Sequence, residues 1–137
     1  MEDTIEIQGG CHCRAVRYTA QTTRYISVYK GNCSICEMKQ NHHFMVSKSQ
    51  FKIDSGEDVL RSYQFNTKVA VHMFCGTCGI CPFYSPRSNP DCFALTIYCV
   101  DDWKKTFPAG TIDWIVFDGE NWEQQMESSD IKKHSSS

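Results

Sequence analysis

The chain has 137 residues, of which 41% are hydrophobic and 22% charged, and its net charge is −2. These values fit one soluble domain. Lys and Arg form no run of five or more, so we expect no nucleic-acid partner, and no apolar stretch approaches the roughly 18 residues of a membrane span.

The N-terminal segment, Met1-Glu2-Asp3-Thr4, is short and acidic. It lacks the charged start and the apolar run of a signal peptide. We therefore expect a cytoplasmic or nuclear protein, in which thiols stay reduced. Nine cysteines in such a compartment indicate metal binding or catalysis rather than disulfides.

Short strand-like runs dominate the chain, separated by turn signals such as Asp54-Ser55-Gly56. Cys92 and Cys99 flank one of these runs and are predicted to be core residues. Helical turns are expected at 36–40, 101–105 and 122–127, before a disordered polar tail at 127–137. The expected strands are 4–8, 15–19, 25–29, 44–46, 51–53, 60–65, 69–74, 83–84, 93–98 and 114–117. The pattern predicts a mainly β domain.

Two cysteine pairs indicate a structural metal. Cys11 and Cys13 form one pair, and Cys75 and Cys78 form the other, which is followed by Gly79. A glycine there suits a tight turn in which backbone N–H groups point at sulfur. Four thiolates are the ligand set of a closed tetrahedral zinc site, so we predict one structural zinc that stabilises the fold.

A third pair, Cys33 and Cys36, has no fourth pair to complete it. A metal held there needs a third protein ligand and leaves an open position for a small thiol or a carbonyl. Without a metal, Cys33 is a free thiol or inert. The candidates for the third ligand are Cys81, His12, His42 and His43.

The segment Gly9-Gly10-Cys11-His12-Cys13-Arg14-Ala15-Val16-Arg17-Tyr18 resembles the opening motif of the glutathione-dependent formaldehyde-activating enzyme family. The resemblance covers about residues 5 to 126 and is closest to the centromere protein V branch. Further motifs in the same order are Asn32-Cys33-Ser34-Ile35-Cys36, Tyr63-Gln64-Phe65-Asn66-Thr67, Phe74-Cys75 through Cys78-Gly79, and Phe83 through Pro90.

The resemblance implies an Mss4-like fold of short coiled β-sheets, with a structural zinc on the two outer cysteine pairs. It also implies a second zinc on a Cys-x-Cys-x-x-Cys motif, associated with glutathione and formaldehyde. This chain departs from the motif because Gly31 stands where the first cysteine belongs. We hypothesise that Cys81, at a position where the branch usually has a polar residue, supplies the missing thiolate.

Two functions follow as hypotheses. The first is a zinc-dependent carbon–sulfur lyase acting on S-hydroxymethylglutathione, in which Cys33 and Cys36 hold the catalytic metal. Lys39, Arg14 and Arg87 are then candidates to pair with the carboxylates of glutathione. The alternative is a non-catalytic relative with one structural zinc and a protein-binding role, because glycine at position 31 cannot ligate a metal.

Overall fold

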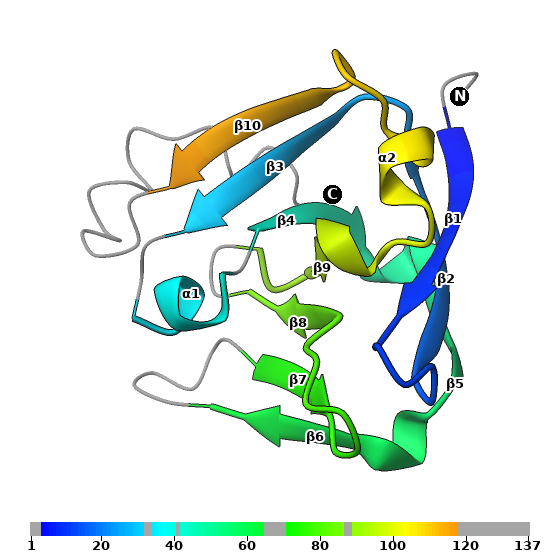
Figure 1. Cartoon of the computed structure of the whole chain (residues 1–137), viewed down its shortest axis with the longest axis vertical. Helices are drawn as coiled ribbons and strands as arrows, with labels where there is room; N and C mark the ends of the chain where they lie inside the picture. Colours follow the sequence, from blue (N-terminus) through cyan, green and yellow to red (C-terminus); the bar gives the residue numbers. More distant parts are fainter. Residues whose placement is uncertain (1–3, 32–33, 41, 65–70, 87–88, 118–137) are drawn as a thin grey trace.

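The computed structural model describes residues 4–31, 34–40, 42–64, 71–86 and 89–117. The prediction of a mainly β, Mss4-like fold is confirmed, because most of the described residues lie in two β-sheets that pack face to face (Figure 1). Cys33, Arg87, the expected turn at 122–127 and the expected tail at 127–137 lie outside the described residues.

The smaller sheet has the order β1-β2-β5 and is antiparallel. Its strands are β1 (Thr4–Gly10), β2 (Arg17–Thr23) and β5 (Phe51–Ser55). Alternation in β1 and β2 places Ile7 opposite Ala20, and both are buried. The β1–β2 connection carries the first cysteine pair, so this sheet fixes one half of the predicted metal site.

The larger sheet has the order β10-β3-β4-β9-β8-β7-β6. β10 and β3 are parallel, and the other neighbours are antiparallel. The strands of this sheet are β3 (Ile26–Gly31), β4 (His42–Ser47), β6 (Leu60–Tyr63), β7 (Val71–Cys75), β8 (Phe83–Ser85), β9 (Cys92–Thr96) and β10 (Ile112–Phe117). The expected strand 93–98 ends at Thr96, because a 3-10 turn follows it.

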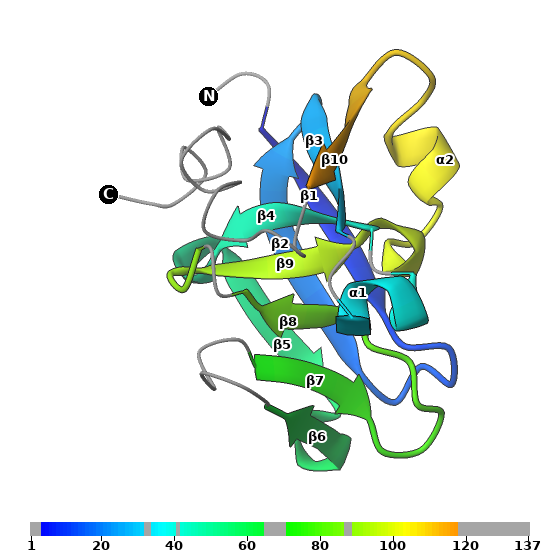
Figure 2. The ribbon, with the colours of Figure 1, turned by 90° about the vertical axis from the view of Figure 1, so that its left-hand side faces the viewer.

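Helical segments are short. Within the described ranges no helix is long and apolar enough to cross a membrane. In Figure 2, α1 is seen in front of the larger sheet, at the height of β8. The α-helices are α1 (Ser34–Lys39) and α2 (Trp103–Thr106), and the 3-10 turns are η1 (Lys48–Gln50), η2 (Glu57–Val59) and η3 (Ile97–Cys99).

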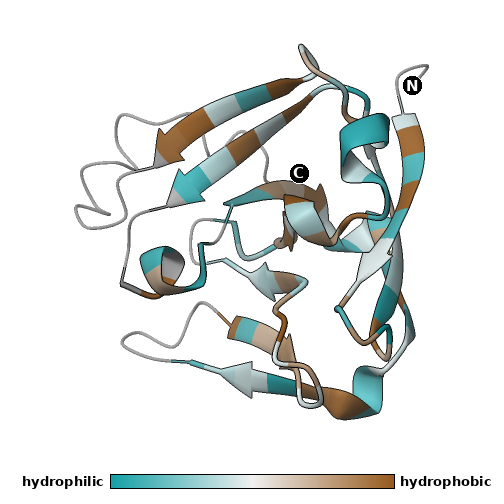
Figure 3. Cartoon of the chain, viewed as in Figure 1, coloured by the Kyte–Doolittle hydropathy of each residue, from teal (hydrophilic) through white to brown (hydrophobic). Residues whose placement is uncertain are grey.

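The core lies between the two sheets and is rich in aromatic rings. Phe83 of the larger sheet meets Phe51 and Tyr18 of the smaller one, with ring centroids 4.9 and 5.9 Å apart. Both pairs meet edge to face, a favourable geometry for aromatic rings. Apolar and polar bands alternate along β3 and β10 (Figure 3).

The end of β1 is tied to the segment after η3. Gly9 forms a β-bridge with Val100, and Asp101 donates its N–H to the carbonyl of Gln8 at 2.8 Å. Both terminal nitrogens of the Arg17 guanidinium also donate hydrogen bonds to the Asp101 carboxylate. These contacts hold the chain on either side of the Cys11–Cys13 turn against the segment that follows η3.

Candidate metal centre and adjoining cavity

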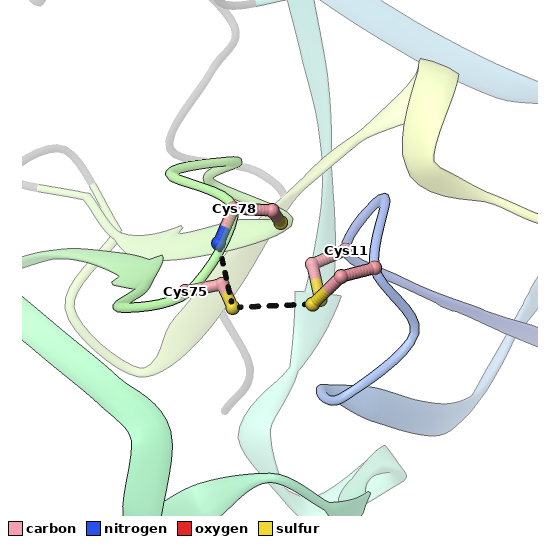
Figure 4. A group of neighbouring side chains, drawn as sticks. Cys11, Cys75 and Cys78 are labelled. Carbon is pink, nitrogen blue, oxygen red and sulfur yellow. Dashed lines mark hydrogen bonds between the residues drawn. The ribbon is translucent and has the colours of Figure 1, made fainter.

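Four cysteine sulfurs meet where the β1–β2 turn faces the turn after β7. The Sγ atoms of Cys11 and Cys13 are 3.6 Å apart, and those of Cys13 and Cys75 are 3.7 Å apart. Together with the Cys78 sulfur, all lie within 4.8 Å of one another. Figure 4 shows Cys75 and Cys78 on one turn and Cys11 on the opposing turn.

These spacings fit a tetrahedral metal. A Zn–S bond of about 2.3 Å places the sulfurs of a regular tetrahedron about 3.8 Å apart. The observed 3.6 and 3.7 Å are close to that value. The four cysteines could therefore hold a metal ion such as zinc, and they are the four that the sequence pairs.

The turn after β7 directs backbone N–H groups at sulfur. Thr77 and Cys78 donate to Cys75 Sγ at 3.3 and 3.5 Å. Gly79 ends the turn with φ +80°, a conformation that glycine adopts readily, and its N–H donates to the Cys75 carbonyl at 2.8 Å. The N–H groups of Cys78 and Thr77 lower the pKa of the Cys75 thiol, although burial opposes them.

The β1–β2 turn is equally tight. Cys11 donates its N–H to the Val16 carbonyl at 3.1 Å, and Val16 donates its N–H to Cys11 Sγ at 3.3 Å. Gly10 precedes this turn, and a Cβ at that position would lie 1.9 Å from the Val16 carbonyl oxygen. Only glycine allows the two chain segments to come this close.

Electrostatics in the cluster favour a cation. Burial raises the pKa of Cys78, but N–H groups of Cys13 and Ile80 outweigh it and lower that pKa to about 6. The Ala15 N–H lowers the pKa of Cys13, whereas burial and the neighbouring thiols raise it to about 11. Neighbouring thiols in the cluster therefore repel one another when several of them are deprotonated. A divalent ion would relieve that repulsion.

A cavity of about 690 Å³ opens beside the cluster and against α1. Gly79 and Ile80, which follow the last cysteine of the cluster, form part of its wall. Its volume lies in the usual range for small-molecule sites. The remaining lining residues are Ile35, Lys39, Gln40, Ser62, Tyr63, His72, Phe74, Cys81, Thr96, Tyr98 and Cys99.

Three polar groups meet in this cavity. The Lys39 ammonium donates to Cys81 Sγ at 3.0 Å and lies 3.2 Å from His72 Nδ1. The His72 ring stacks on Tyr84 with centroids 4.7 Å apart and an interplanar angle of 9°. Burial, followed by the Lys39 charge, lowers the pKa of His72 to about 4, so the ring is neutral at pH 7.

The structure describes only part of the group proposed around the middle cysteine pair, because Cys33 lies outside the described residues. Cys36 belongs to α1, whose Ile35 and Lys39 line the cavity, and Cys81 lines the same cavity. Gly31 ends β3 immediately before the Asn32-Cys33 segment. Cys81 Sγ lies 3.0 Å from the Nζ atom of Lys39, which belongs to the same helix as Cys36.

The three histidine candidates have other surroundings. His12 is exposed on the β1–β2 turn. His42 Nδ1 lies 2.7 Å from the Tyr98 hydroxyl, and His43 is buried with its Nε2 3.5 Å from the Tyr84 hydroxyl. None of the three lines the cavity among the residues described there.

Two further expectations need comment. Cys92 is fully buried, as predicted, but the prediction for Cys99 is wrong because η3 places that residue half-buried at the cavity wall. Arg14 is exposed on the β1–β2 turn, away from the cavity wall. His72 was missed by sequence reasoning, although a titratable residue inside an apolar run was a signal for it.

The fold and the site define a small, mainly β protein with a four-sulfur candidate metal centre beside a ligand-sized cavity. A sequence model described as "Glutathione-dependent formaldehyde-activating enzyme" matches residues 6–115, well over half of the chain. The chain belongs to this family.

One solved structure with this fold is a crystal structure of a Rhodobacter sphaeroides protein. That protein is 28% identical to this chain, and the match covers 78% of this chain and 98% of the other, with a TM-score of 0.67. The two proteins therefore share an arrangement of strands over nearly the whole length of the bacterial chain.

Proposed function

We propose that this protein is a zinc-dependent carbon–sulfur lyase acting on S-hydroxymethylglutathione, the adduct of glutathione and formaldehyde. The observation that carries this proposal is the cavity of about 690 Å³ against α1, lined by Lys39 and Cys81, in a chain of the formaldehyde-activating family. In this proposal, the structural zinc is bound by Cys11, Cys13, Cys75 and Cys78.

The cavity offers an anion partner and apolar walls. Lys39 is the one cationic residue among its described lining residues, so it is the natural partner for a glutathione carboxylate. Ile35, Phe74 and Ile80 give the cavity apolar walls. A charge pair in such surroundings is stronger than one in bulk water.

The reaction breaks the carbon–sulfur bond of HO–CH₂–S–glutathione. The hydroxyl proton passes to the sulfur, and formaldehyde and the free thiol are released. The reverse step forms the same bond from the thiol and the aldehyde. The second zinc of the proposal, held by Cys33, Cys36 and Cys81, would stabilise the thiolate and polarise the oxygen.

The alternative remains a non-catalytic member with one structural zinc and a protein partner. Gly31 favours it, because glycine offers no ligand atom. Exposed apolar side chains at the cavity favour it too: Tyr63, Tyr98 and Ile80 are 51%, 47% and 38% exposed. We also propose that the protein belongs to the centromere protein V branch and that it is located in the cytoplasm or nucleus.

Exchange NMR with ¹³C-formaldehyde and glutathione tests the lyase. Zinc-loaded protein is expected to accelerate exchange between formaldehyde and its glutathione adduct, because both directions use the same bond. Lys39→Met is expected to weaken glutathione binding in calorimetry, whereas Lys104→Met on α2 is the control. No acceleration, together with no binding at millimolar glutathione, would reject the lyase in favour of the non-catalytic alternative.

A further inference from the structure

Two side chains in the cavity direct lone pairs at one positive charge. Lys39 Nζ lies 3.0 Å from Cys81 Sγ and 3.2 Å from His72 Nδ1. An ammonium is only a donor, so toward Lys39 both the sulfur and the ring nitrogen act as acceptors. The three residues come from α1, β7 and the segment before β8, so the tertiary fold creates this meeting point.

Both acceptors are held in place. His72 is 4% exposed and stacks flat on Tyr84. The Cys81 carbonyl accepts the Thr96 hydroxyl at 3.0 Å, and the Cys81 thiol reaches the Phe83 carbonyl at 3.5 Å. Fixed ligands lose little conformational freedom when a cation binds, which favours binding.

We propose that Cys81 and His72 together bind a zinc-class divalent cation in the cavity, at the point that the Lys39 ammonium occupies. A sulfur and an imidazole nitrogen are the donor pair that zinc and similar borderline metals prefer. The inference rests on the second zinc of the proposed function and adds His72 to its ligands.

This ligand pair accounts for glycine at position 31. The sulfur of Cys81 and the nitrogen of His72 come from outside α1, the helix that contains Cys36, and both reach Lys39 of that helix. These two ligands replace the one that Gly31 lacks. The metal site is thus rebuilt from several elements rather than within one loop.

Lys39 is the competitor of the metal. Its ammonium and the ion use the same two lone pairs, so the lysine withdraws when the ion binds. The cavity of about 690 Å³ leaves room for that movement. Once displaced, the ammonium is available to a substrate carboxylate. Removing the Lys39 charge therefore strengthens metal binding, whereas removing either ligand weakens it.

The test is a Zn²⁺ titration against a chromophoric chelator, with protein that already holds one equivalent. Wild-type protein is expected to bind a second equivalent. His72→Gln and Cys81→Ser should each weaken that equivalent by at least about tenfold, since even outer-shell changes cost 10–100-fold. Lys39→Met should strengthen it severalfold. His42→Gln and Lys104→Met are matched controls and should match wild type.

Co²⁺ in place of the second zinc gives an independent readout, because Cys81→Ser should reduce the sulfur-to-cobalt charge-transfer absorbance. Lys39→Met keeps both ligands, so its gain in affinity does not depend on the folding of the ligand variants. A second equivalent bound equally by wild type, His72→Gln and Cys81→Ser would overturn the inference, as would its absence from wild type.

The two proposals fail in different ways. Accelerated formaldehyde exchange by wild type, combined with unchanged metal binding by His72→Gln, would retain the lyase and reject this site. Loss of the second equivalent in both ligand variants, with no exchange catalysed by wild type, would retain the site and reject the lyase.

Discussion

The sulfurs of Cys13 and Cys75 are 3.7 Å apart although 62 positions separate the two residues. The chain between them forms strands of both sheets, from β2 to β7. A metal that joins these sulfurs therefore links the β1–β2 turn to the far part of the larger sheet. Loop closure on this scale is costly for a flexible chain, and metal binding would offset that cost.

Cys75→Ser is expected to abolish binding of the structural zinc and to unfold the domain at ordinary temperature. Zinc bound by such sites contributes about 10–16 kcal/mol at pH 7, as much as the 5–15 kcal/mol stability of a typical domain. Metal analysis and circular dichroism would measure both effects. His12→Ala is the control, because His12 is exposed between two ligands. A folded, zinc-loaded Cys75→Ser protein would contradict the prediction.

Two glycine substitutions should differ in cost. Gly79 has φ +80° with nothing within 4 Å of a new Cβ, so Gly79→Ala should cost only the left-handed strain of about 1–2 kcal/mol. A Cβ at Gly10 would lie 1.9 Å from the Val16 carbonyl oxygen, so Gly10→Ala must displace backbone. Urea unfolding should show the larger loss for Gly10→Ala, and equal losses would contradict this account.

Tyr18→Phe is expected to leave stability unchanged or raise it by about 1 kcal/mol. The Tyr18 hydroxyl is buried and has no hydrogen-bond partner among the described residues, so its removal relieves a desolvated polar atom. Tyr18→Ala should instead cost about 3–5 kcal/mol through the lost ring. Thermal unfolding measures both, and a clear loss of stability in Tyr18→Phe would reveal a hydroxyl partner.

The Arg17–Asp101 ion pair should show measurable coupling. The Arg17 side chain is 19% exposed and donates two hydrogen bonds to Asp101, which favours a coupling of about 1 kcal/mol in a double-mutant cycle. Lys52 and Asp54 are a matched control, because they are 3.9 Å apart and Lys52 is 80% exposed. Equal coupling in both cycles would argue against a special role for the Arg17–Asp101 pair.

Stability should rise with pH through the titration of His72 in protein holding only the structural metal. The folded pKa of about 4 lies below the ordinary 6.5, so between these values only the unfolded state binds the proton. The gain is at most about 3 kcal/mol. Lys39 and Tyr84 are two of the groups that face the ring.

Urea unfolding from pH 5 to 7.5 measures this slope. His72→Gln is expected to flatten it, because glutamine does not titrate, and His12→Gln should keep the wild-type slope. An unchanged slope in His72→Gln would assign the pH dependence to other groups.

Much of the local structure could be predicted. Alternation located β1, a short strand-like run located β10, and the cysteine pairs with their glycines indicated two tight turns. The expected strand at 93–98 was too long, because the chain turns into η3 after Thr96. That turn brings Cys99 to the cavity wall, and no periodic pattern encodes such a change of direction.

The sequence by itself determined the β class, the family and the pairing of Cys11 and Cys13 with Cys75 and Cys78, since these depend on local spacing and residue type. Only the tertiary structure decided that Lys39 meets His72 and Cys81, which lie 33 and 42 positions further along the chain. The reason is physical: spacing fixes neighbours along one element, whereas meetings across a cavity depend on which strands pair and on how the sheets pack.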